Sequence, residues 1–112
     1  MAMAAVEPLG SADPFDTAQW LVVRGTLRES DLVPLLEGAI ADGGGSVTLD
    51  LCNLDVLTPG GCWTIRNLAE ELWARGRLLT VVFPAGGHVA DVLRSTGTVE
   101  HARMAFQASS AD

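Results

Sequence analysis

The segment TPGG at residues 58–61 holds the groups of this sequence that are best placed to take part in chemistry. It lies where a run of alternating apolar residues ends and a helical pattern begins. Thr58 suits the N-cap of that helix, because its hydroxyl can accept a hydrogen bond from a first-turn N–H group and proline is favoured at the next position. The same hydroxyl could accept a phosphoryl group. Thr58 therefore has two interpretations, a helix cap and a phosphorylation switch, which do not exclude each other.

The two glycines of this segment suggest a third kind of chemistry. Gly60 and Gly61 would leave N–H groups uncovered at the start of the helix, which is a potential anion site. No lysine follows them as in a P-loop, and the dinucleotide pattern GxGxxG is absent. Nucleotide or small-ligand sensing through these amides is therefore an alternative and not the main expectation.

The other reactive side chains are too scattered to predict catalysis or metal binding. His88 and His101 are far apart, Cys52 and Cys62 do not form a CxxC pair, and GxSxG is missing. A carboxylate at the end of a strand, such as Asp50, more often hydrogen-bonds a neighbouring loop than acts on a substrate. We expect buried, reduced thiols, no metal and no cofactor, and we expect that the protein is not an enzyme.

Trp63 is the candidate for protein recognition. At 100° per residue it lies about 160° from Ile65, the centre of the predicted apolar face of the helix, and it shares its side with Arg66. Tryptophan is enriched among the hot spots of protein interfaces. Trp63 is therefore either an interface anchor or a side chain that packs against the loop or a neighbouring helix.

Composition limits the classes of function. The chain has 112 residues, of which 48% are hydrophobic, so it is long enough for one folded domain. Its net charge is −7 and its basic side chains form no stripe, which argues against a nucleic-acid partner. No apolar run approaches the ~18 residues that cross a bilayer, and no signal peptide is evident. We expect a cytoplasmic protein without membrane insertion.

The apolar patterns predict alternating strands and helices. Strands are expected at residues 18–27, 46–51 and 78–83, with one more short strand after residue 97, and helices at about 32–40, 59–75 and 87–97. Ser30 or Asp31 is the expected N-cap of the first helix, and Pro34 fits only in its first turn. The short apolar strands look buried on both faces, as in a parallel sheet covered by helices. This order is typical of an α/β protein.

Three segments carry a resemblance to a known family: VVRGTL, then SVTLDLCNLDVLTPGG, then LLTVVFPAGGHVADVLRSTG. In this order and spacing, residues 20–108 resemble the STAS domain of bacterial anti-sigma factor antagonists (anti-anti-sigma factors). The resemblance implies a single STAS-type α/β domain at residues 17–108, with a mixed, mostly parallel sheet and helices packed mainly on one face. Residues 1–16 and 109–112 are then expected to be a flexible N-terminal tail and a C-terminal tail.

The family resemblance implies a noncatalytic module for signalling and transcription regulation. In the family, a partner kinase phosphorylates the first serine of an Asp-Ser-Ser-Gly loop, whereas the unphosphorylated form binds an anti-sigma factor and releases a sigma factor. The family loop aligns its aspartate with Thr58, its phosphorylated serine with Pro59, its second serine with Gly60 and its glycine with Gly61. Arg28 replaces the aspartate of the family pattern Gly-x-Leu-Asp. The usual switch is therefore either absent or moved to Thr58.

The partner implied by the resemblance is an anti-sigma factor or serine kinase that brings its own ATP, and a homodimer is also possible. One alternative is an accessory STAS subunit that docks on the ATPase of an ABC-type lipid transporter. Another is the small-ligand or nucleotide sensor described above. For protein binding, the expected contact residues surround the start of the second helix: Arg28, Thr58, Pro59, Gly60, Gly61, Trp63 and Arg66.

Overall fold

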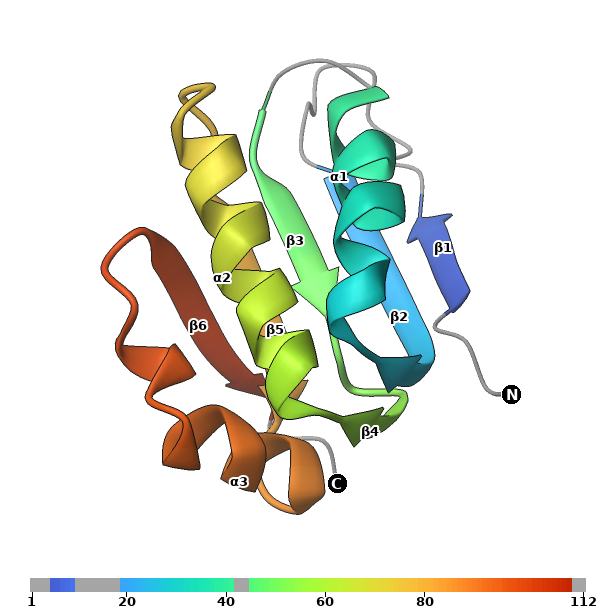
Figure 1. The fold of residues 1–112 in the computed structure, drawn as a ribbon, viewed down its shortest axis with the longest axis vertical. Coiled ribbons are helices and arrows are strands. Elements are labelled where there is room, and N and C mark those ends of the chain that lie inside the picture. Colours follow the sequence, from blue (N-terminus) through green and yellow to red (C-terminus); the bar gives the residue numbers. More distant parts are fainter. Residues whose placement is uncertain (1–4, 10–18, 42–44, 110–112) are drawn as a thin grey trace.

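The structure, a computed structural model, describes residues 5–9, 19–41 and 45–109. Its strands and helices follow the predicted α/β order, with β1 and β4 as additional strands (Figure 1). The elements are β1 (Ala5–Leu9), β2 (Gln19–Leu27), α1 (Leu32–Ala41), β3 (Val47–Asp50), β4 (Leu54–Leu57), α2 (Pro59–Trp73), β5 (Leu79–Pro84), α3 (His88–Ser95) and β6 (Met104–Ser109). Two single turns of 3-10 helix are η1 (Glu29–Asp31) and η2 (Thr98–Glu100).

The strands form one mixed, mostly parallel sheet. The order is β1-β2-β3-β5-β6, and β4 pairs with the far end of β2. The strands β2, β3, β5 and β6 run parallel, as do β2 and β4, whereas β1 is antiparallel to β2. Parallel neighbours need a crossover, and α1, α2 and α3 supply it. The predicted fold class is therefore confirmed.

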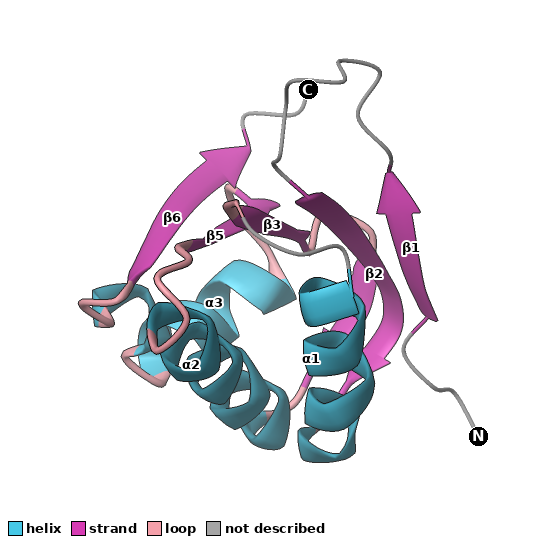
Figure 2. Ribbon diagram, turned by 90° about the horizontal axis from the view of Figure 1, so that it is seen from above, coloured by secondary structure: helices cyan, strands magenta, loops and turns pink. Residues whose placement is uncertain are grey.

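The helices cover one face of the sheet only (Figure 2). The apolar stripe predicted for α2 is fully buried against that face, at Ile65, Leu68, Ala69 and Leu72. On β5 the buried side chains alternate with half-buried ones, as expected when only one face is covered. The prediction that the short strands are buried on both faces is therefore wrong. Their second face carries half-buried side chains: Thr48, Asp50, Thr80 and Val82.

Several boundaries differ from the sequence prediction. Strand β1 lies inside the segment expected to be a flexible tail, and β4 lies between the predicted strand at residues 46–51 and the predicted helix at 59–75. Ser109, the first residue of the predicted C-terminal tail, ends β6. The remaining residues of the two predicted tails, 1–4, 10–16 and 110–112, lie outside the described part of the chain. Asp31 is the last residue of the turn η1 and directly precedes α1. Its Oδ2 accepts a hydrogen bond of 2.8 Å from the N–H of Arg28. Pro34 lies in the first turn of α1, as predicted.

Candidate docking site at the start of α2

Thr58 joins β4 to α2 and is the N-cap of the helix. Its backbone is extended, with φ −88° and ψ 161°, and its Oγ1 accepts a hydrogen bond of 2.9 Å from the N–H of Gly61. The same hydroxyl donates to the carbonyl oxygen of Leu27, also at 2.9 Å, and the N–H of Thr58 reaches that oxygen at 3.3 Å. The predicted cap is confirmed, and the hydroxyl has a second function that the sequence did not indicate. It ties the start of α2 to the end of β2.

The glycines allow the first turn of α2 to pack directly on backbone. A Cβ atom on Gly61 would lie 2.3 Å from the carbonyl oxygen of Leu27 and 2.9 Å from Cδ1 of Leu57. Such distances are impossible for a side chain, so only glycine permits this approach. A Cβ on Gly60 would lie 3.2 Å from the backbone nitrogen of Glu29, which is tight but not prohibitive. The start of α2 is therefore held closely against β2 and η1.

The backbone N–H groups of the first turn of α2 are largely bonded within the turn. The N–H of Gly61 is bonded to Thr58 Oγ1, and the N–H of Cys62 donates to the Thr58 carbonyl oxygen at 3.1 Å. A capped turn offers fewer free donors to an anion. The expectation that Gly61 leaves its N–H group uncovered is wrong, and the nucleotide hypothesis loses one of its two donors.

Arg28 is fixed beside α2 through its backbone. Its carbonyl oxygen accepts a hydrogen bond of 2.8 Å from Oγ1 of Thr64, a buried side chain in the second turn of α2. Its N–H is held by Asp31, as described above. Sequence reasoning did not single out Thr64. The signal was available, because Thr64 is a polar residue next to Ile65 on the apolar stripe of a helix, where a hydroxyl needs a buried acceptor.

The starts of α1 and α2 and strand β4 lie at one end of the molecule (Figure 1), and each of these elements exposes an apolar side chain. Trp63 is 43% exposed, Val56 of β4 is 41% exposed and Val33 of α1 is 61% exposed, while Pro59 is also exposed. Trp63 therefore does not lie in the core. Arg66, a further predicted contact residue on α2, is half-buried and donates to Oγ1 of Thr98 at 3.3 Å.

The predicted contact residues therefore fall into two groups. Residues 58–61 and Arg28 surround the first turns of α2, where they pack on β2 and η1. Trp63 shares its side of α2 with Arg66. The guanidinium of Arg66 instead points toward η2, on the side of α3 and β6 (Figure 1).

Several titratable side chains of the described residues take part in structural contacts. His88 is exposed, and its Nε2 accepts a hydrogen bond of 3.1 Å from the N–H of Leu57 and so links α3 to β4. Both cysteines are free; Cys62 is buried, whereas Cys52 is only half-buried. Burial first, and then hydrogen bonding and the charge of Asp50, raise the pKa of the Cys52 thiol, although a hydrogen bond from Ser109 opposes this. A thiol that stays protonated is a poor nucleophile.

Neither metal binding nor membrane insertion has support in the described residues. Among them, His, Cys, Asp and Glu form no group that could hold a metal ion. The helices found in the described part of the chain are also too short or too polar to cross a bilayer.

Comparisons with known proteins agree with this architecture. No family model and no curated protein sequence matches the chain. Among solved structures, it is similar to an uncharacterized protein of the DUF3478 family from Shewanella loihica PV-4, described as having a SpoIIAA-like fold. The TM-score is 0.56 and the identity 19%, with 99% of this chain and 88% of that chain covered. The chain therefore has the SpoIIAA-like fold, which is the fold of STAS domains and anti-sigma factor antagonists.

Proposed function

We propose that this chain is a noncatalytic, cytoplasmic protein-binding module that acts as an anti-sigma factor antagonist. In this proposal it binds an anti-sigma factor of the histidine-kinase-like ATPase type and thereby releases a sigma factor. The partner supplies ATP, and this chain needs no cofactor. The SpoIIAA-like fold supports a protein-binding role, but fold alone does not determine function.

The observation that carries the proposal is the exposure of Trp63 beside a rigid helix start. Trp63 lies one turn from the capped residues, and Val33 and Val56 expose further apolar surface on the adjoining elements. Exposed tryptophan side chains are enriched among interface hot spots. The hydrogen bonds of Thr58 and the close packing of Gly61 fix this surface before a partner arrives, which lowers the entropic cost of binding.

We further propose that this surface lacks the phosphorylation switch of the family and that Thr58 is a cap only. Pro59 has no hydroxyl. A phosphate on Thr58 would break its hydrogen bond to the Leu27 carbonyl oxygen and place roughly −1.5 to −2 charges beside that oxygen. Modification would therefore disrupt the junction of α2 with β2, not only its outer surface.

Two experiments test these proposals. Co-purification from the native cell, with the bound protein identified by mass spectrometry, is expected to recover an ATPase-type anti-sigma factor. Recovery of a lipid-transporter ATPase would instead favour the accessory-subunit alternative. For the switch, the recovered kinase is incubated with the chain and ATP; an unmodified Thr58 is expected, while stoichiometric phosphate on Thr58 would show that the switch has moved there.

A further inference from the structure

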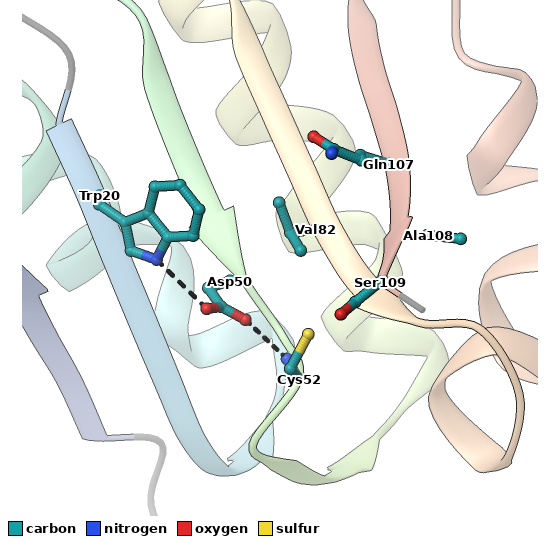
Figure 3. A pocket seen from close by; sticks show the side chains of 7 residues that line it. All are labelled: Trp20, Asp50, Cys52, Val82, Gln107, Ala108 and Ser109. Atoms are coloured by element: carbon teal, nitrogen blue, oxygen red, sulfur yellow. Dashed lines mark hydrogen bonds between the residues drawn. The ribbon is translucent and has the colours of Figure 1, made fainter. Parts of the chain in front are cut away.

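A pocket of about 490 Å³ lies on the sheet face opposite the helices, near the carboxyl ends of β3 and β5 (Figure 3). It is separate from the docking site at α2. Its size falls within the range of about 300–1,000 Å³ that is usual for small-molecule sites. The side chains that line it include Trp20, Asp50, Cys52, Val82, Gln107 and Ser109.

The register of the sheet brings these side chains together. Asp50 pairs with Val82 on β5 and, through Val82, lies in the same row as Gln107 on β6. Successive residues of a strand point to opposite faces, so residues in this row share the face that the helices leave uncovered. Trp20, from β2, completes the group, and its indole Nε1 donates to Asp50 Oδ2 at 3.2 Å.

Asp50 is the charged group of the pocket. Its Oδ2 accepts from Trp20, and its Oδ1 accepts a hydrogen bond of 2.9 Å from the N–H of Cys52. None of the described cationic side chains forms an ion pair with it. A carboxylate offers about four acceptor positions, two on each oxygen. The Cys52 thiol also hydrogen-bonds this carboxylate, but a thiol is a weak donor. A forked, two-pronged donor can displace it and take one further position on each oxygen.

The surroundings of Asp50 favour a planar cation. Trp20 is 39% exposed, and an indole ring is a good surface for a guanidinium to stack upon. Val82 supplies an apolar wall suited to a methylene chain, while Gln107 and Ser109 add neutral hydrogen-bonding groups. The Cys52 thiol, whose pKa is raised, contributes no second charge. A lysine-type ammonium would fit the Asp50 carboxylate less well, because it is a point charge and lacks the two parallel N–H groups of a guanidinium.

We propose that this pocket binds a guanidinium group, either of free arginine or of an arginine side chain in a peptide. Asp50 accepts the two parallel N–H bonds, Trp20 stacks on the plane of the cation, and Val82 contacts the aliphatic stem. This site would give the chain a ligand-binding function on the face opposite the proposed docking surface. It does not depend on the identity of the protein partner.

The test uses Trp20 as its own reporter. The variant Trp63→Phe/Trp73→Phe leaves Trp20 as the single tryptophan, and its fluorescence is followed during titration with arginine, with the peptide Gly-Arg-Gly and with citrulline. Citrulline has the same length as arginine but a neutral head group. We expect a saturable change with arginine, the peptide or both, and none with citrulline. In the same background, Asp50→Asn should weaken binding about tenfold or more, because it removes the charge.

The exposed carboxylate Asp55 on β4, outside the pocket, provides the matched control, and Asp55→Asn should leave the titration unchanged. A response to the peptide alone identifies a chain-borne arginine as the source, and a response to free arginine alone identifies a small molecule; both support the proposal. Equal responses to arginine and citrulline would overturn it, as would no saturable response up to about 20 mM of either arginine source. If Asp50→Asn does not fold, the comparison of arginine with citrulline still decides.

Discussion

Substituting Gly61 by alanine should release the start of α2 from β2. The new Cβ would lie 2.3 Å from the Leu27 carbonyl oxygen, so the helix must move by about 1 Å to restore ordinary contact. That movement breaks both hydrogen bonds from Thr58 to Leu27, at about 1 kcal/mol each, and disturbs packing by about 1–3 kcal/mol. The better helix propensity of alanine returns less than about 1 kcal/mol. We expect a net loss of about 2–4 kcal/mol in the free energy of unfolding.

Gly38 supplies the matched control for this prediction. It lies in α1, and a Cβ atom at this position would have no neighbouring atom within 4 Å. Gly38→Ala should therefore raise the free energy of unfolding by about 1 kcal/mol. Urea unfolding of both variants, followed by circular dichroism and tryptophan fluorescence, gives the two free energies. We expect Gly61→Ala to lower the free energy of unfolding and Gly38→Ala to raise it. A Gly61→Ala protein as stable as the original would refute the close packing of α2 on β2.

Three further predictions concern the side chains that hold the fold together. Thr58→Ala should cost about 1–2 kcal/mol in urea unfolding, whereas Thr58→Ser should keep most of the stability because it keeps the hydroxyl; equal losses would mean that the cap is unimportant. Arg77 is buried and donates to the carbonyl oxygens of Gly45 and Ala39 at 2.8 and 2.7 Å, so Arg77→Met should lower the free energy of unfolding by about 2 kcal/mol and a neutral result would contradict this. Because the folded state raises the pKa of Cys52, the folded protein holds this proton more tightly, and stability should fall as the pH rises past the ordinary thiol pKa. Thermal melting against pH should show that fall in the original protein and a smaller one in Cys52→Ser, while alkylation of Cys52 should stay slow until the same pH range.

Local patterns were enough to predict most of the fold. The 3.6-residue period of α2 and the pair Thr58-Pro59 predict the start of this helix and its buried stripe, because both signals lie within a few residues of each other. The alternating apolar run before residue 58 indicates β structure but does not mark where β3 ends and β4 begins. The four residues of β4 do not alternate in burial, and its pairing with β2 shifts register between Gly25 and Thr26. Pairing partners distant in sequence decide its structure, as they do for β1.

The sites were predictable to a smaller extent. The cap function of Thr58 follows from local chemistry, and the hydrogen bond from Asp50 to its own loop was expected. The second bond of Thr58, to Leu27, and the close approach of Gly61 depend on a contact between residues more than thirty positions apart. The pocket likewise draws its side chains from four separate segments of the chain. Only the register of the sheet and its uncovered face bring them together.

The central claim is that a partner protein docks on the surface around the start of α2, and two tryptophans on that helix test it most directly. Trp63 and Trp73 are similarly exposed, at 43% and 48%, but they lie near opposite ends of α2. The guanidinium carbon Cζ of Arg103 lies 5.9 Å from the centre of the Trp73 ring. Trp73 lies outside the proposed surface.

The decisive measurement is the affinity of the co-purified partner for Trp63→Ala and Trp73→Ala, by isothermal titration calorimetry on variants with unchanged melting temperatures. We expect Trp63→Ala to weaken binding by more than about 1 kcal/mol, about fivefold, and Trp73→Ala to leave it nearly unchanged. Equal affinities of both variants, or a loss confined to Trp73→Ala, would contradict docking at the start of α2.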